Sequence, residues 1–208
     1  MFITFEGIDF CGKSTQVKLL KDHLEKNNRT VEIIREPGGT EISEKVRDVL
    51  LDKANNKMFM ETEIFLFSAS RAQLVREKIR PYLEKGIYVI SDRFHDSTTA
   101  YQGFGRGIEL EIVEHINQLA IGKTLPDITF FIDIPVEVAE NRKAKDKHIS
   151  LDRIEVSEIN FYEKVREGYL FLAEKENRIK RLDGTKTIPE IHNEIISHIT
   201  SLEKKEFA

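Results

Sequence analysis

Residues 7–14, Gly-Ile-Asp-Phe-Cys-Gly-Lys-Ser, have the residue types and spacing of a phosphate-binding loop, G-x-x-x-x-G-K-[ST]. The glycines of such a loop let several backbone N–H groups point into one concavity, where they and the N-terminus of the next helix bind polyphosphate oxygens. The lysine reaches the β and γ phosphates, and the serine is a ligand for Mg²⁺. We therefore expect Mg²⁺ at Ser14. A nucleoside triphosphate is expected at Gly7, Ile8, Asp9, Phe10, Cys11, Gly12, Lys13, Ser14 and Thr15.

An acid and a guanidinium, Asp92 and Arg93, follow another apolar segment. Charged groups at the edge of a sheet are unfavourable unless they have partners. Many phosphate-loop enzymes hold Mg²⁺ at the position of Asp92, directly or through water, and Arg93 suits two hydrogen bonds to a second phosphate. A structural ion pair is the alternative. Downstream, Thr98, Tyr101 and Gln102 share one face if the segment is helical, which suits the reading of a base or sugar.

Two further patterns could contribute to a nucleotide pocket. The segment 36–40 contains Pro-Gly-Gly, which forces a turn, and Thr40 is placed to cap the helix after it. In the long helical segment 61–83, Phe67 and Arg71 are four residues apart and share one face. An aromatic ring beside a guanidinium suits a planar base, but a buried phenylalanine next to a solvated arginine is the more common arrangement.

The elements that must position these residues are predicted by apolar runs rich in β-branched and aromatic residues. These runs span residues 2–5, 31–34, 87–90, 128–134 and, more weakly, 179–182, with segments of helical character between them. Strands that are apolar throughout and separated by helices predict an α/β fold, with about five parallel strands covered on both faces. Ligands of such sheets bind at the carboxyl ends of the strands, which is where the candidate residues lie.

Composition limits the alternatives. The chain has 208 residues, 40% of them hydrophobic, and no linker divides it, so we expect a single domain over 1–208. Its formal net charge of −4, with charged residues at 33%, does not indicate a nucleic-acid partner. The only cysteine, Cys11, cannot form an internal disulfide. Because no signal peptide or membrane span is recognisable either, we expect a cytoplasmic protein with no membrane partner.

Five segments also resemble the motifs of bacterial thymidylate kinases, in the same order and at similar separations. They are residues 5–15, 35–40, 67–71, 92–103 and 152–169, and the most specific is Asp-Arg-Phe-His-Asp-Ser-Thr-Thr-Ala-Tyr-Gln-Gly at 92–103. The resemblance implies a three-layer phosphate-loop fold with a mobile lid at about 142–153 and a homodimer. It also implies Mg²⁺-dependent transfer of the γ-phosphoryl group from ATP to dTMP, giving dTDP and ADP for dTTP synthesis.

The resemblance further implies roles for individual residues. Phe67 would stack on thymine, Arg71 and Arg93 would approach the base edge and the monophosphate, and Thr98 would hydrogen-bond the pyrimidine. Tyr101 would lie against the 2′ position and favour deoxyribose. The implied acceptor contacts are Asp9, Glu36, Pro37, Arg47, Phe67, Arg71, Arg93, Ser97, Thr98, Tyr101 and Gln102, and the implied catalytic residues are Asp9, Lys13, Arg93 and Arg153.

The catalytic arginine of this family lies either in the phosphate loop or in the lid. The loop position holds Phe10 here, where the bacterial pattern more often has glycine, so the resemblance places the arginine in the lid. Arg153, in Leu-Asp-Arg-Ile-Glu, is the best match. The other lid cations are Arg142, Lys143, Lys145 and Lys147, and a solvated charged surface is the alternative for the lysines.

Other functional classes lack their signatures. A GTPase switch needs an Asp-x-x-Gly after the phosphate loop and an Asn-Lys-x-Asp, and neither occurs. A transport ATPase needs Leu-Ser-Gly-Gly-Gln, which is also missing from the sequence. The six histidines form no His-x-x-x-His pair with an intervening acid, which disfavours a zinc enzyme. A deoxynucleoside kinase or another pyrimidine monophosphate kinase stays open as the alternative. The pair Arg71 and Arg93 favours an acceptor that carries a phosphate.

Overall fold

The five apolar runs form one parallel sheet in the computed structural model, which describes residues 1–145, 152–154 and 159–206. The strand order is β2-β3-β1-β4-β5, and all neighbouring strands are parallel. The strands are β1 (Phe2–Glu6), β2 (Val31–Arg35), β3 (Tyr88–Asp92), β4 (Ile128–Asp133) and β5 (Ile179–Asp183). The predicted α/β class is confirmed, and each strand ends within two residues of its predicted end.

The sequence pattern of each strand follows from its place in the sheet. The central strands β1 and β4 are buried along their whole length, whereas the edge strands β2 and β5 alternate between buried and more exposed residues. The register places Asp92 of β3 level with Phe5 of β1 and Arg35 of β2. The carboxyl ends of these three strands therefore meet at one edge, where the candidate site begins.

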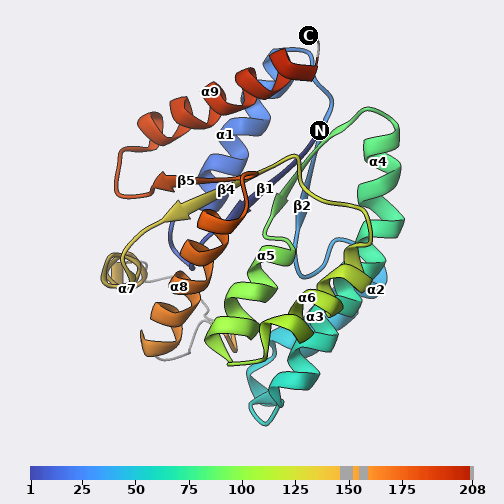
Figure 1. Cartoon of the computed structure of the whole chain (residues 1–208), viewed down its shortest axis with the longest axis vertical. Coiled ribbons are helices and arrows are strands. Elements are labelled where there is room, and N and C mark those ends of the chain that lie inside the picture. Colours follow the sequence, from blue (N-terminus) through green and yellow to red (C-terminus); the bar gives the residue numbers. More distant parts are fainter. Residues whose placement is uncertain (146–151, 155–158, 207–208) are drawn as a thin grey trace.

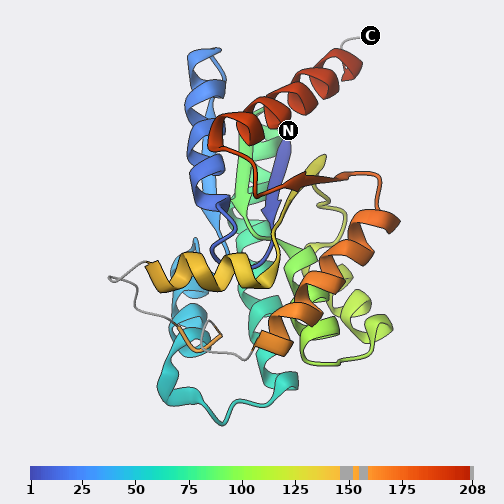
Figure 2. The ribbon, with the colours of Figure 1, turned by 90° about the vertical axis from the view of Figure 1, so that its left-hand side faces the viewer.

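Helices cover both faces of the sheet (Figures 1 and 2). On one face, α1 (Lys13–Lys26) packs against α9 (Ile188–Glu206). The other face carries most of the remaining helices, and α8 (Ile159–Lys175) contacts β4 and β5 there. The other helices are α2 (Glu41–Leu51), α3 (Met60–Leu74), α4 (Arg80–Glu84), α5 (His95–Thr98), α6 (Leu110–Ile121), α7 (Val136–Lys145) and the 3-10 turn η1 (Lys53–Asn55). No helix among these ranges is long and apolar enough to span a membrane.

Two helical segments contain π-helical turns that the sequence did not predict. The predicted helix 61–83 is divided by η2 (Val75–Ile79), which lies between α3 and α4. Pro81 explains this division, because it has no N–H to donate and its ring would collide with the carbonyl of the preceding turn. The second π turn, η3 (Thr99–Gly105), continues α5 and carries Tyr101 and Gln102. Thr40 caps α2 as expected, since its side chain accepts a hydrogen bond from Ser43 N.

Candidate active site

A cavity of about 680 Å³ opens at the carboxyl ends of β1, β2 and β3. The phosphate loop contributes one wall, and the turn after β2, the helices α2 and α3 and the segment after β3 contribute most of the rest. The predicted residues that line it are Asp9, Phe10, Gly12, Lys13, Ser14, Thr15, Glu36, Pro37, Arg47, Phe67, Arg71, Asp92, Arg93, Ser97, Thr98, Tyr101 and Gln102. Donor and acceptor candidates thus share one cleft.

The phosphate loop has the close packing that its glycines predict. Gly7 has φ 138°, and a Cβ atom there would lie 2.5 Å from the backbone oxygen of Ile132 in β4, so only glycine fits. Lys13, at the start of α1, is buried, and its Nζ donates to Gly7 O at 3.1 Å and Ile8 O at 3.0 Å. Phe10 has φ 63°, which places a non-glycine residue in the left-handed region at the position that departs from the bacterial pattern.

The two candidate metal ligands lie together. Ser14 Oγ donates to Asp92 Oδ2 at 3.0 Å, across the junction between α1 and the end of β3. A hydroxyl and a carboxylate are oxygen ligands of the kind that Mg²⁺ prefers, and this ion commonly uses one or two protein ligands together with phosphate oxygens and water. The donor set therefore fits the ion expected from the sequence.

Arg93 joins the phosphate loop to the acceptor side of the cleft. Its guanidinium donates to Asp9 Oδ1 at 2.5 Å and Gly7 O at 2.8 Å, and also to the hydroxyls of Tyr101 at 2.9 Å and Tyr169 at 3.0 Å. Burial raises the pKa of Asp9, but the positive charges of Arg93 and Lys13 outweigh burial and leave that pKa below its ordinary value. Asp9 is thus an ionised partner for Arg93 at neutral pH.

Arg71 is fixed in the wall of the cleft by neutral and charged partners. Its side chain is 2% exposed. Nε donates to Glu36 Oε2 at 2.7 Å, Nη1 to Thr98 Oγ1 at 2.7 Å and Nη2 to Phe94 O at 3.1 Å. Phe67 lines the same cavity one helical turn earlier on α3. The pairing predicted from the i, i+4 spacing therefore belongs to the cleft, and Arg71 is a buried residue rather than a solvated one.

Arg153, the expected lid arginine, pairs with Glu63 in this structure. Its Nη2 is 2.7 Å from Glu63 Oε2, its Nε donates to Leu50 O at 2.8 Å, and it does not line the main cavity. The reason is that the carboxylate of Glu63 is buried and attracts the guanidinium. Arg153 is thus outside the cleft in this structure, and its catalytic role stays a prediction.

Arg142 lies beside the phosphate loop instead. It is in the last turn of α7, lines the main cavity and donates to the carbonyls of Phe10 and Cys11, both at 3.2 Å. The expected lid begins within this helix, because Lys143 and Lys145 also belong to α7. Residue 147 and the rest of the lid at 146–151 lie outside the described residues.

Comparison with known proteins identifies the family. The family model described as Thymidylate kinase matches residues 5–195. The chain belongs to the thymidylate kinase family. A thymidylate kinase of Kosmotoga olearia is 46% identical over 207 residues, which cover 99% of this chain and 98% of that relative. A thymidylate kinase of Fervidobacterium nodosum is 48% identical over 196 residues, which cover 94% of this chain and 96% of that relative.

A solved structure agrees with this assignment. The crystal structure of thymidylate kinase from Ehrlichia chaffeensis matches with a TM-score of 0.77 and 35% identity, and the match covers 96% of this chain and 98% of that one. The fold and the family predicted from the sequence are therefore confirmed. Membership of the thymidylate kinase family also makes the chain a nucleotide kinase, which is a phosphotransferase.

Sequence reasoning missed several residues of this thymidylate kinase fold that support the site. Glu6, the last residue of β1, is completely buried, and its carboxylate faces the turn that carries Arg93. A charged residue between an apolar run and a phosphate loop was a signal that could have identified it. Tyr169 of α8 contacts both Arg93 and Glu6. No local pattern marks it, because α8 reaches the site only through the fold.

Proposed function

We propose that the protein transfers the γ-phosphoryl group of ATP to dTMP, giving dTDP and ADP as a step toward dTTP. The observation that carries the proposal is one cleft in which Arg93 contacts both the phosphate loop and the tyrosine of the acceptor side. Phosphoryl transfer requires that donor and acceptor phosphates approach in line, and a shared cleft with a cation between its two halves suits that geometry.

On the donor side, the backbone of residues 7–15 would hold the triphosphate, with Lys13 on its β and γ groups. Ser14 and Asp92 would hold Mg²⁺, Asp92 directly or through water. That ion, when bound, supplies charge neutralisation at the phosphate oxygens. Arg142, whose guanidinium lies at the loop carbonyls, adds positive charge at the same wall.

On the acceptor side, Phe67 would stack on thymine, with Arg71 and Thr98 at the base edge. Tyr101 would lie against the 2′ position, Asp9 near the sugar hydroxyl, and Arg93 at the monophosphate. The remaining proposed contacts line the same cavity and are Glu36, Pro37, Arg47, Ser97 and Gln102.

The proposed catalytic residues, Asp9, Lys13, Arg93 and Arg153, act by positioning and charge. Two like unit charges 4 Å apart repel by about 4 kcal/mol at an effective dielectric constant near 20, so two phosphates need several cations in one place. Lys13 and Arg93 already lie at the junction of the two halves. Arg153 would have to exchange Glu63 for a phosphate to take part.

We also propose a cytoplasmic homodimer in which residues 1–208 form one domain. All five strands belong to one sheet, which supports the single domain. Exposed apolar side chains on adjacent helices, Phe65 of α3 and Ile112 and Leu119 of α6, support a second copy as their partner. The single cysteine, Cys11, is a buried residue of the phosphate loop, and its unpaired thiol suits a reducing compartment.

The test is an assay with ATP, Mg²⁺ and a panel of nucleosides and nucleoside monophosphates. We expect dTMP to give the fastest turnover and uridine monophosphate to be poor. Lys13→Ala should abolish turnover, whereas Lys18→Ala, an exposed lysine of the same helix, should leave it unchanged. Faster turnover of thymidine than of dTMP would favour the deoxynucleoside kinase, and another preferred monophosphate would favour a different pyrimidine kinase.

A further inference from the structure

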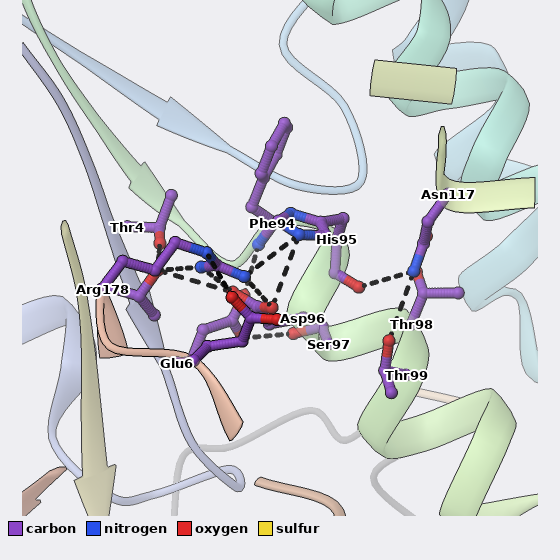
Figure 3. Close-up of polar contacts among 12 residues, drawn as sticks. Thr4, Glu6, Phe94, His95, Asp96, Ser97, Thr98, Thr99, Asn117 and Arg178 are labelled. Atoms are coloured by element: carbon purple, nitrogen blue, oxygen red, sulfur yellow. Dashed lines mark hydrogen bonds and ion pairs between the residues drawn. The ribbon is translucent and has the colours of Figure 1, made fainter. Parts of the chain in front are cut away.

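Glu6 is a completely buried carboxylate that accepts hydrogen bonds from two separate elements. Figure 3 shows it beside Phe94 and Ser97. From the segment after β3, Phe94 N donates to Oε1 at 2.7 Å and Ser97 Oγ donates to Oε2 at 2.5 Å. From α8, the hydroxyl of Tyr169 donates to Oε2 at 2.9 Å. A buried carboxylate must have such partners to remain ionised.

The partners of Glu6 are also the neighbours of Arg93. Arg93 has φ 70°, a left-handed conformation that is unfavourable for a residue with a long side chain. Its own N–H donates to Phe5 O at 3.0 Å, and the next N–H, of Phe94, is the one that Glu6 accepts. The guanidinium of Arg93 donates to the same two hydroxyls that contact Glu6, Ser97 Oγ at 3.3 Å and Tyr169 OH at 3.0 Å.

We propose that Glu6 is a positioning residue for the acceptor phosphate: its carboxylate holds the turn after β3 in the conformation that keeps Arg93 and Ser97 at the cleft. The inference rests on the proposed function, since it assigns Glu6 to the half of the site that receives a nucleoside monophosphate. Glu6 lies behind the cleft and does not line it, so it acts on the acceptor through Arg93 and Ser97.

The charges around Glu6 make this support sensitive to pH. Burial and, secondly, the negative charge of Asp96 raise the pKa of Glu6 to about 7, against the opposing effects of Arg93 and of the hydrogen bonds from Ser97 and Phe94. As pH falls through 7, the carboxylate takes up a proton and loses part of its capacity to accept hydrogen bonds. The support for the Arg93 turn is therefore nearly complete at pH 8, half lost near pH 7 and largely lost at pH 6.

The other titratable groups facing Glu6 do not change charge in the same range. Tyr169 of α8 has a pKa raised well above its ordinary value by burial, so it stays neutral. Arg178, which precedes β5, stays charged and pairs with Asp96 at 2.7 Å. Burial lowers the pKa of His95 to about 4, so this imidazole is neutral from pH 6 to pH 8.

The test compares Glu6→Gln with the wild type in steady-state assays at pH 8 and pH 6. At pH 8 we expect KM for dTMP to rise by about tenfold or more, the loss typical of a hydrogen bond to a charged group, with KM for ATP within about twofold. At pH 6 the ratio of variant to wild-type KM should shrink to below about threefold, because wild-type Glu6 is then protonated. Ionisation of dTMP itself changes KM equally for both proteins, so its effect cancels in the ratio.

Two further variants complete the test. Glu25→Gln changes the same chemical group on the exposed side of α1 and should match the wild type. Tyr169→Phe removes the hydroxyl shared by Glu6 and Arg93 and should raise KM for dTMP by about threefold, so the proposal stays testable if Glu6→Gln does not fold. The role of Glu6 would be overturned if Glu6→Gln and the wild type had the same KM for dTMP at pH 8. It would also be overturned if the variant raised KM for dTMP and KM for ATP by the same factor.

Failure of the proposed function can be distinguished from failure of the Glu6 inference. If the proposed function were wrong, the wild type itself would not phosphorylate dTMP at pH 8 or at pH 6. A crystal structure of Glu6→Gln then tests the inference alone: we expect the Arg93 guanidinium to move away from Asp9. An unchanged turn with the Arg93–Asp9 pair intact would refute the positioning role.

Discussion

At the scale of single residues, the two arginines of the acceptor pocket are held differently. Arg71 is fixed by one buried carboxylate and two oxygens from the segment after β3, whereas Arg93 shares its partners with the phosphate loop and with Glu6. A guanidinium satisfies several acceptors in fixed directions, which a compact ammonium group cannot do. Position 71 therefore requires the shape of a guanidinium as well as its positive charge.

Replacing Arg71 with lysine should consequently impair binding and stability together. One Nζ cannot reach Glu36, Thr98 and Phe94 O at once, so buried acceptors lose their donors. We expect KM for dTMP to rise by about 10- to 100-fold and the free energy of unfolding to fall by about 2–3 kcal/mol. Steady-state kinetics and urea denaturation measure the two effects.

The control for this variant is Arg29→Lys, at a partly exposed ion pair with Glu203. Exposed pairs contribute little, so neither KM nor the denaturation midpoint should change appreciably. Retention of wild-type dTMP binding by Arg71→Lys would mean that charge alone is sufficient at position 71.

The sequence revealed these arginines because their spacing relates them to other candidates, four residues from Phe67 and one residue after Asp92. It did not reveal their partners. Tyr169 lies 76 residues from Arg93, and only the packing of α8 on the sheet brings its hydroxyl to the guanidinium. The partner of Arg153 was hidden for a similar reason, since nothing near it in the sequence indicates the buried carboxylate of Glu63.

At the scale of elements, the short helix α5 is unusual because all four of its residues are buried and polar. Arg178 fixes this helix to the sheet: it donates to both oxygens of Asp96 at 2.7 Å and to Thr129 Oγ1 of β4 at 2.8 Å (Figure 3). His95 completes the cluster, and its Nε2 lies 3.3 Å from Arg178 Nη2. The element that carries Ser97 and Thr98 is thus held by polar contacts.

This cluster predicts a loss of stability in acid. Burial lowers the folded-state pKa of His95 to about 4, below the unfolded value of 6.5, so the folded protein binds this proton less tightly. The stability that neutral His95 contributes is present above pH 6.5 and is lost as pH falls toward 4. Between pH 6.5 and pH 5 the loss should be roughly 2 kcal/mol.

Chemical denaturation of His95→Gln at several pH values checks this effect. The variant should lose less free energy of unfolding than the wild type between pH 6.5 and pH 5, while His115→Gln, an exposed control on α6, should follow the wild type. Because the pKa of Glu6 is raised, its contribution to the free energy of unfolding increases as pH falls, opposite to that of His95. This contribution is the same in all three proteins and cancels in the comparison. Parallel curves for His95→Gln and the wild type would contradict the prediction.

Element positions were largely predictable, and their internal irregularities were not. Apolar runs located all five strands, most clearly β1 and β4, which are covered on both faces and apolar along most of their length. The signal was weakest for the edge strand β5, whose burial alternates. The π turns depend on local constraints, Pro81 in one case and the packing of η3 against α8 in the other. A periodicity of 3.6 residues does not encode such widened turns.

At the scale of the whole molecule, the strand order β2-β3-β1-β4-β5 brings three strand ends to one cleft. The sequence could not give this order, because fully buried strands carry little information about their neighbours. The other surface of interest lies on α3 and α6, where Phe65 is 62% exposed and Leu119 is 79% exposed. Large apolar side chains with this exposure on adjacent helices are typical of an interface.

The homodimer can be tested with the double variant Phe65→Asp and Leu119→Asp. We expect the wild type to sediment as a dimer and the double variant as a monomer, because an unpaired carboxylate in an apolar interface is strongly unfavourable. Ile188→Asp, at an exposed position of α9, should remain dimeric. A wild type that sediments as a monomer at micromolar concentration would contradict the proposed assembly.

The carbonyl contacts of Lys13 have a consequence for how tightly a triphosphate can bind. A lysine side chain in solution samples many rotamers, and immobilising it costs up to about 2 kcal/mol of conformational entropy. Here Gly7 O and Ile8 O already restrict that sampling. The loop is thus pre-organised, and most of the electrostatic attraction between its ammonium group and a polyphosphate is available as binding free energy.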